Sequence, residues 1–175
     1  MRILFLHGLE SQPNCLKVKW LQDQGHSVQS PQIDYHDDRS YEKIYKLTRH
    51  NNYDVIVGSS MGGWFAWNLG KELGVPVLLL NPALHSRSIN PSIGEWVGEE
   101  KKGSKVFLAL GNIDYVIDPS KTVDWLNEND KSDWNANNTR RGAYGHRTPV
   151  EQFKYIFNHF ELGINQTNEL YERLS

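Results

Sequence analysis

The sequence predicts an α/β fold, with a mostly parallel central sheet of about six strands and helices on both faces. Short apolar runs recur along the chain, each bounded by turn residues, and amphipathic stretches lie between several of them. Parallel strands covered on both faces give such continuous apolar runs, and their alternation with helices is typical of βα units. The chain has 175 residues, the length of one domain, so we expect a single domain over residues 1–175.

Five strands are well marked, and a sixth is weakly patterned. They are predicted at Arg2–His7, Ser27–Ile33, Asp54–Ser59, Val75–Asn81 and Lys105–Leu110, with the weak one at Asp133–Arg140. The first lies in the run "MRILFLHG", which lacks the longer apolar core and the cleavage site of a secretory signal. No apolar run approaches the roughly 20 residues that span a bilayer. We therefore expect a soluble protein.

Amphipathic stretches predict five helices. They are expected at Cys15–Gln24, Tyr41–His50, Gly62–Leu73, Pro119–Glu128 and Pro149–Phe160. Asn14 stands where the N-cap of the first helix belongs, and Asp118 before Pro119 is a strong start signal for the fourth. The long irregular stretch Pro82–Ser104 is of a length that often forms a lid or binding loop, so we consider a small lid there but no large cap domain.

The charge and the cysteine content of the chain limit the kinds of partner and cofactor that we expect. The formal charge is −2, from 19 basic and 21 acidic residues without a long block of one sign, so neither nucleic acid nor a membrane surface is an expected partner. Cys15 is the only cysteine, which excludes an internal disulfide and favours the cytoplasm. The segment "YHDD" at Tyr35–Asp38 lacks helical ligand spacing. We expect a small-molecule substrate and no metal or cofactor.

The pentapeptide "GSSMG", from Gly58 to Gly62, matches the pattern G-x-S-x-G and assigns the nucleophile position to Ser60. This pattern has meaning only between a strand and a helix, where the serine lies on a sharp, strained turn. An apolar run precedes it and a helical pattern follows, so the context is present. The alternative is a Ser/Gly turn at a helix start, in which Ser59 or Ser60 is only an N-cap.

A serine hydroxyl needs a base and an orienting acid to act as a nucleophile. Asp114 and Asp118 both follow the fifth strand, and we prefer Asp114 because Asp118 has an ordinary role as a helix cap. For the base, His146 lies in a glycine-flanked loop just before the last predicted helix. The order of nucleophile, acid and histidine predicts that His146 takes the proton of Ser60 while Asp114 orients the imidazole.

A tetrahedral oxyanion needs two preorganised donors. The N–H of Met61, directly after the nucleophile, is the first candidate. The second should come from the loop after the first strand, where we prefer the N–H of Leu9 to that of Glu10. Candidates for substrate contact are Gly8, Glu10, Trp64 and His85. A tryptophan one helical turn after the nucleophile is as often part of the core as of an acyl pocket.

Together the motifs resemble those of small α/β-hydrolases, and more narrowly those of the YqiA-like bacterial esterases. The matching segments are "LHG" at Leu6–Gly8, "GSSMGG" at Gly58–Gly63, "LLNPAL" at Leu79–Leu84, "GNIDYVID" at Gly111–Asp118 and "GH" at Gly145–His146. The resemblance implies a minimal α/β-hydrolase fold and a serine esterase for short acyl esters without a cofactor. Compared with a full-sized α/β-hydrolase, the chain begins at the strand that carries the oxyanion loop, so we expect the first two strands to be missing. Because no large cap domain fits in 175 residues, we expect an open, shallow site.

Three hypotheses for function follow. The first is a carboxylic ester hydrolase that uses Ser60, Asp114 and His146 through an acyl-enzyme. The second is an acyl thioesterase or amidase with the same triad, since the triad does not distinguish leaving groups. The third is a non-catalytic binding module on a hydrolase scaffold, which requires His146 to lie out of reach of Ser60. The natural substrate, the acyl chain length and the oligomeric state are left open.

Overall fold

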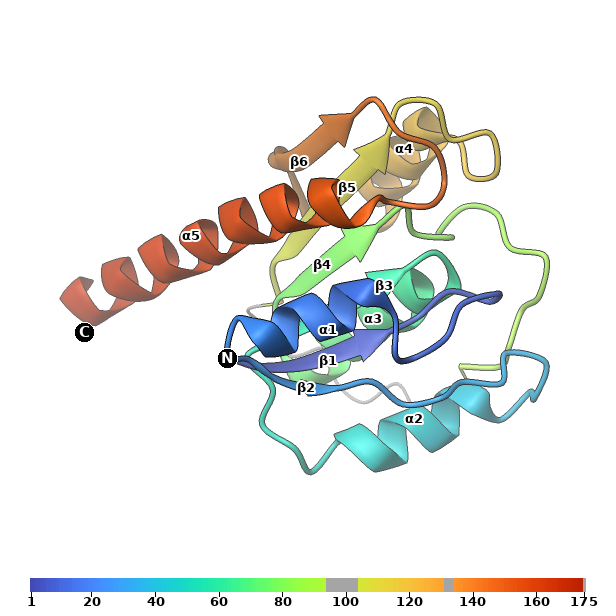
Figure 1. The fold of residues 1–175 in the computed structure, drawn as a ribbon, viewed down its shortest axis with the longest axis horizontal. Coiled ribbons are helices and arrows are strands. Elements are labelled where there is room, and N and C mark those ends of the chain that lie inside the picture. The colour runs from blue at the N-terminus through green and yellow to red at the C-terminus, as the bar shows by residue number, and fades with distance from the viewer. Residues whose placement is uncertain (94–103, 131–133, 175) are drawn as a thin grey trace.

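The computed structural model describes residues 1–93, 104–130 and 134–174, and in these ranges strands and helices alternate (Figure 1). The strands are β1 (Arg2–Leu6), β2 (Ser27–Gln29), β3 (Val55–Ser59), β4 (Val77–Leu80), β5 (Val106–Gly111) and β6 (Trp134–Gly142). The helices are α1 (Leu16–Asp23), α2 (Ser40–Thr48), α3 (Met61–Leu73), α4 (Pro119–Asn129) and α5 (Val150–Leu174).

The six strands form one sheet in the order β2-β1-β3-β4-β5-β6, and each neighbouring pair is parallel. The predicted α/β class with a parallel sheet is confirmed. The order reverses between β1 and β3, since β2 lies on one side of β1 and all later strands lie on the other. In open parallel sheets, ligands bind at such a switch point, beyond the carboxyl ends of the strands.

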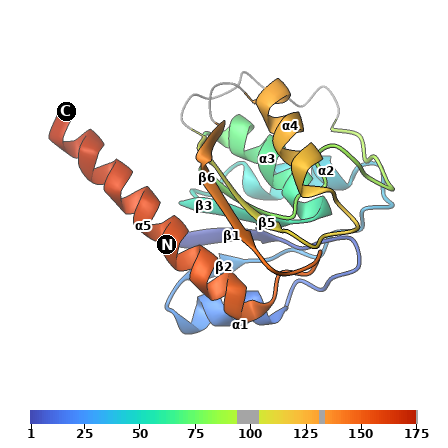
Figure 2. The same ribbon diagram turned by 90° about the horizontal axis from the view of Figure 1, so that it is seen from above.

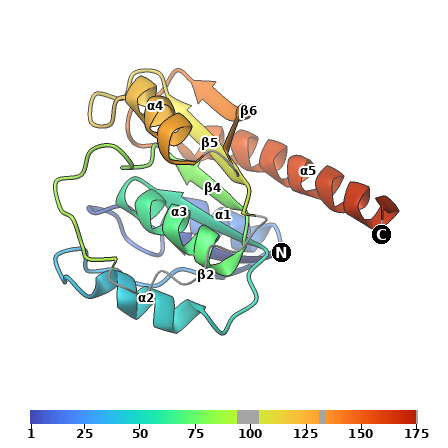
Figure 3. The same ribbon diagram turned by 180° about the vertical axis from the view of Figure 1, so that it is seen from behind.

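Helices cover both faces of the sheet (Figures 2 and 3). Helices α2, α3 and α4 pack on one face, and α1 and α5 on the other. Alternation along β1 shows why both faces are apolar: Leu4 and Leu6 enter the core under α2, α3 and α4, whereas Ile3 and Phe5 enter the core under α1 and α5. The sheet is therefore buried on both sides, and ligands have access to its edges and ends.

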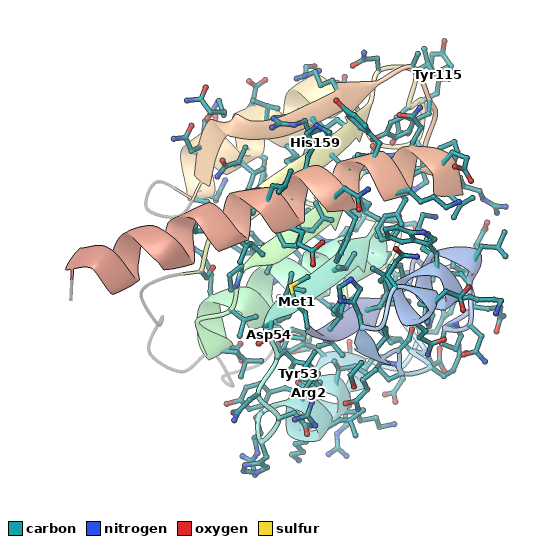
Figure 4. All side chains as sticks on the ribbon, turned by 60° about the vertical axis from the view of Figure 1, so that its left-hand side comes forward. Met1, Arg2, Tyr53, Asp54, Tyr115 and His159 are labelled. Carbon is teal, nitrogen blue, oxygen red and sulfur yellow. The ribbon has the colours of Figure 1, made fainter. Side chains whose placement is uncertain are left out.

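A polar cluster lies at the end of the sheet where β1 and β3 begin. At the amino ends of β1 and β3, Arg2 N donates to Asp54 Oδ2 at 2.6 Å, and the Arg2 guanidinium lies over the ring of Tyr53. Figure 4 shows these side chains near Met1, and Tyr115, which follows β5, on the far side of the molecule. The carboxyl ends of the strands thus lie away from this polar cluster.

Four strands are shorter than predicted: β1 and β3 by one residue each, and β2 and β4 by more. Strand β2 ends at Gln29, not Ile33, because the chain leaves the sheet before Pro31, and the Ile33 N–H then donates to the ring of His7. Strand β4 ends at Leu80, because Asn81 has a left-handed backbone with φ of 43°. The weakly patterned sixth strand is present as β6, although the predicted first residue, Asp133, lies outside the described residues.

The helix predictions need two corrections. Helix α5 runs to Leu174, not to Phe160, because a single glycine at position 163 costs only about 1 kcal/mol in a helix. Helix α1 has Cys15 at its N-cap without a side-chain hydrogen bond, so the prediction of Asn14 as the cap is wrong. Asp118 is confirmed as the N-cap of α4, since its carboxylate accepts the N–H groups of Ser120 and Lys121.

The predicted lid at residues 82–104 is described only in part. Residues 82–93 form neither helix nor strand, and residues 94–103 lie outside the described residues. The Arg87 guanidinium donates to the carbonyls of Ala83 and Leu84 within this stretch. It also lies 4.0 Å from the ring centre of Trp64, a contact that attaches the stretch to α3. Within the described ranges, no helix is long and apolar enough to cross a membrane.

Candidate active site

Ser60 lies at the sharp turn between β3 and α3. It is the N-cap residue of α3, with φ of 52° and ψ of −118°. A residue other than glycine rarely adopts a positive φ, and such a conformation persists only where the surrounding structure imposes it. Here Ser60 N donates to Leu80 O at 3.0 Å, and Ser60 O accepts from Gly63 N at 2.9 Å. The predicted strained turn between strand and helix is present.

Two glycines let the strand and the helix approach each other at this turn. A Cβ on Gly58 would lie 2.3 Å from Gly62 O, and one on Gly62 would lie 2.1 Å from Leu6 O. Atoms at such distances overlap, so neither position accepts a side chain without a shift of the backbone. The close approach brings the N-terminus of α3 against the end of β1, where the loop with Gly8 begins.

Three polar side chains from separate loops form a hydrogen-bonded series. His146 Nε2 lies 2.9 Å from Ser60 Oγ, and His146 Nδ1 lies 2.8 Å from Asp114 Oδ2. An ionised carboxylate only accepts hydrogen bonds, so Nδ1 carries the proton and the lone pair of Nε2 faces the serine hydroxyl. The Asp114 side chain is 1% exposed and that of His146 is 21% exposed. Solvent therefore reaches the imidazole of His146 but not the carboxylate of Asp114.

The second oxygen of Asp114 is held by its own loop. Asp114 Oδ1 accepts the N–H of Val116 at 2.8 Å and that of Ile117 at 2.9 Å, which fixes the plane of the carboxylate. Of the two acids considered from the sequence, Asp114 is the one that contacts His146, while Asp118 caps α4.

The peptide between Gly8 and Leu9 is fixed by a buried histidine. Because Ile33 N–H donates to His7 Nε2 at 3.1 Å, the proton of the ring is on Nδ1, which donates to Gly8 O at 2.8 Å. Ser11 N also donates to Gly8 O. In a trans peptide the carbonyl and the N–H point in opposite directions, so the Leu9 N–H is directed away from His7. A Cβ on Gly8 would lie 3.3 Å from Ser60 Cβ, which places this loop beside the serine.

Met61 is the first residue of α3, so its N–H has no acceptor inside the helix. The two N–H groups predicted to bind an oxyanion therefore lie in the loop after β1 and at the start of α3. The sequence predicts His7 as the last residue of the first strand and indicates no role for its side chain. No local pattern indicates its role, because its partner Ile33 is 26 residues away.

The residues predicted to contact substrate lie in three environments. Glu10 is exposed and lies 3.8 Å from Arg147, which follows His146, so this ion pair is beside the site. Trp64 is half-buried, stacks on Trp67 and contacts the core under α3. His85 Nδ1 lies 3.3 Å from Thr122 Oγ1. Burial is the main cause that lowers the pKa of His85. A substrate contact of these three side chains stays a prediction.

The loop around Asp114 also carries exposed apolar side chains that the sequence did not single out. They are Ile113, Tyr115 and Val116, which are 51%, 95% and 66% exposed. Figure 4 shows Tyr115 at the outer edge of the molecule. Among the described residues, no group of three or more His, Cys, Asp or Glu side chains is arranged as a metal site.

The parallel sheet, the serine at a strained turn after β3, the acid after β5 and the histidine before the last helix define an α/β-hydrolase fold. Solved structures agree. A putative hydrolase of the alpha/beta superfamily from Xanthomonas campestris pv. campestris matches with a TM-score of 0.67 at 15% identity, covering 93% of this chain and 98% of that one. Zea mays acyl-protein thioesterase 2 matches with a TM-score of 0.59 at 14% identity, over 93% of each chain. A Pyrococcus furiosus esterase matches with a TM-score of 0.56 at 15% identity, over 98% and 81%.

The chain belongs to UPF0227, an uncharacterised protein family whose model matches residues 2–134. This membership confirms the resemblance to YqiA-like proteins. The match contains Ser60 and Asp114 and ends before His146. No curated protein matches the sequence of this chain.

Proposed function

We propose that this chain is a serine hydrolase that cleaves carboxylic esters of short acyl chains through an acyl-enzyme. The observation that carries the proposal is the series Ser60–His146–Asp114, with distances of 2.9 and 2.8 Å, on a strained turn at the switch point of a hydrolase fold. The distance of 2.9 Å also speaks against a non-catalytic binding module, because that hypothesis needs His146 to lie out of reach.

The reaction follows from this arrangement. As Ser60 Oγ attacks the acyl carbon, His146 Nε2 takes the proton of this hydroxyl, and Asp114 stabilises the resulting imidazolium. The N–H groups of Leu9 and Met61 bind the oxyanion, each contributing roughly 10²–10³-fold to turnover. His146 then protonates the leaving alcohol, which departs as the C–O bond breaks. Water then attacks the acyl carbon as His146 takes one of its protons. The bond between the acyl carbon and Ser60 Oγ breaks, His146 returns the proton to Oγ, and the carboxylic acid leaves.

A fluorophosphonate probe tests the nucleophile directly. We expect the wild type and Ser59→Ala to be labelled, and Ser60→Ala not to be labelled, because Ser60 Oγ lies within hydrogen-bond reach of the imidazole of His146. The neighbouring Ser59 is the matched control, as it lies in the same turn. Equal labelling of Ser60→Ala, or no labelling of a folded wild type, contradicts the proposal.

Hydrolysis of thioesters or amides is the second candidate, since the same triad serves these leaving groups. The likeness to Zea mays acyl-protein thioesterase 2 supports a comparison of acyl donors, although at 14% identity it shows only the shared fold. We propose to compare kcat/KM for p-nitrophenyl acetate, an acyl-CoA and an amide. A higher kcat/KM for the acyl-CoA replaces esterase by thioesterase. Series of p-nitrophenyl esters then define the acyl length.

A further inference from the structure

The turn after β4 carries a buried amide that bridges two loops of the site. Asn81 is 1% exposed, and its Nδ2 donates to the carbonyls of Gly145 at 3.1 Å and His146 at 2.8 Å. Its Oδ1 accepts the N–H of Gly111 at 2.7 Å. These partners fix the orientation of the amide, because a flipped side chain would set an oxygen against two carbonyls and an NH₂ group against an N–H.

The same turn is bonded to the nucleophile. Ser60 N donates to Leu80 O at 3.0 Å, and Ala83 N donates to Ser60 O at 3.0 Å. Pro82 packs so closely on α3 that a Cβ on Gly63 would lie 2.6 Å from it. Leu80–Ala83 therefore contacts the backbone of Ser60 directly.

The turn also reaches the acid, through β5. Asn81 N donates to Ala109 O at 2.9 Å, and Gly111, which donates to Asn81 Oδ1, accepts in turn from Asp114 N at 3.3 Å. One short turn thus links the backbones that carry the serine, the histidine and the acid, although these residues are far apart in the sequence.

We propose that Asn81 is a positioning residue, which holds the backbone of His146 at the distance from Ser60 and Asp114 that the reaction needs. This inference rests on the proposed function. The loop with His146 connects β6 to α5, and a displacement of about 1 Å at a reacting group costs on the order of 10²-fold in rate. Asn81 opposes this displacement at the two carbonyls that flank the His146 α-carbon.

Asparagine suits the position for two reasons. Its φ of 43° is left-handed, a region that asparagine enters more readily than most residues. Its short side chain offers a donor and an acceptor together, which the three surrounding backbone groups require. Loss of the amide leaves two partly buried carbonyls and one buried N–H without this partner.

Two variants test the side-chain hydrogen bonds of Asn81 separately from its left-handed backbone. Asn81→Gly keeps the left-handed backbone and removes the three side-chain bonds. Asn81→Asp keeps the size and the acceptor for Gly111 N–H, but at neutral pH it places a carboxylate oxygen against the carbonyls of Gly145 and His146. Thr48→Val is the control, because it also removes a buried side-chain bond to a carbonyl, that of Ile44 within α2.

The readouts are the rate constant of fluorophosphonate labelling and the low-field proton resonance of the His146 Nδ1–H that is bonded to Asp114. We expect both Asn81 variants to unfold cooperatively, to be labelled about 10²-fold more slowly and to lose or shift the resonance, while Thr48→Val keeps both. A wild-type labelling rate and an unchanged resonance in either folded Asn81 variant overturn the inference. If the wild type itself is not labelled, the proposed function fails, and the resonance, which needs no substrate, then decides the role of Asn81.

Discussion

Asp114 performs two separate tasks with its two carboxylate oxygens. Oδ2 accepts from the ring of His146, and Oδ1 accepts from two N–H groups of its own loop. The loop bonds hold the oxygen pair in place whether or not the histidine is present. The contribution of Asp114 to folding stability and its effect on the orientation of the His146 ring can therefore be tested separately.

Replacing Asp114 by Asn tests this separation. The Asn oxygen keeps the N–H groups of Val116 and Ile117, and its NH₂ then faces His146 Nδ1, which must accept. The ring proton moves to Nε2, so the base loses the lone pair that faces Ser60. We expect kcat for p-nitrophenyl acetate to fall about 10³–10⁴-fold, with the thermal unfolding midpoint nearly unchanged. A loss of activity that only follows a loss of folded protein would contradict this account.

The residues of the site differ in how visible they are in the sequence. Ser60, Asp114 and His146 lie at positions that a chain-order pattern specifies, because the chemistry needs a particular residue type after a particular element. His7 and Asn81 act through contacts with residues 26 and 65 positions away. Such contacts depend on strand order. His7 and Asn81 lie in the family-like segments "LHG" and "LLNPAL", but these segments do not indicate which distant groups the two side chains contact.

At the scale of elements, the approach of α3 to β1 depends on Gly62. Its replacement by Ala puts a Cβ within 2.1 Å of Leu6 O and 2.6 Å of His7 O, which are backbone atoms with little freedom to move. We expect a loss of about 3 kcal/mol or more in the free energy of unfolding in urea. Gly145→Ala is the matched control, because the nearest atom to its Cβ, Ile113 O, is 3.5 Å away. Equal stability of the two variants would refute the steric argument.

The packing of α2 against α3 predicts a pH dependence of stability. Burial raises the pKa of Glu72, whose Oε1 accepts from Tyr41 at 2.8 Å and whose Oε2 has no hydrogen-bond partner within the described residues. Because the pKa of Glu72 is higher in the folded than in the unfolded state, the stability that this group contributes is fully present below its unfolded pKa, about 4.3. That contribution is lost as the pH rises through the pKa of the folded state. Glu72→Gln removes this loss, so we expect it to raise the unfolding midpoint at pH 8 and to change little at pH 3.

Glu42 in α2 is the control of opposite sign. Hydrogen bonds from Arg39, and then from Lys46, lower the pKa of Glu42 to about 2. The stability that Glu42 contributes is therefore present above its pKa in the unfolded state and is lost as the pH falls toward about 2. Glu42→Gln should lower the unfolding midpoint at pH 8 and have a vanishing effect in strong acid. If both variants shift the midpoint in the same direction at pH 8, the assignment of these shifts is wrong.

Element ends were the least predictable part of the fold. The periodicity of apolar residues identifies β2 and α5 but not where they stop. Strand β2 stops at Gln29, before Pro31, and beyond this end the Ile33 N–H donates to His7, a contact between segments far apart in the sequence. Helix α5 continues through Gly163 because one unfavourable residue does not outweigh its helical neighbours.

At the scale of the whole molecule, the single sheet couples two cores. The central strand β3 contributes Ile56 to the core under α2, α3 and α4, and Val55 and Val57 to the core under α1 and α5. The alternation of elements predicts such a layered sheet. The strand order that joins the two cores is set by long-range pairing, which periodicity does not report.

This coupling predicts that damage to one core weakens both. Phe157 in α5 is fully buried against Trp20, Phe153 and Phe160, so Phe157→Ala should cost about 3–5 kcal/mol. Because β3 belongs to both cores, we expect hydrogen exchange to accelerate equally in peptides of α1 and of α3. Leu162→Ala, at a position 60% exposed on the same helix, should change neither the free energy of unfolding nor the exchange rates in α1 and α3. Faster exchange confined to α1 and α5 would show that the two faces open independently.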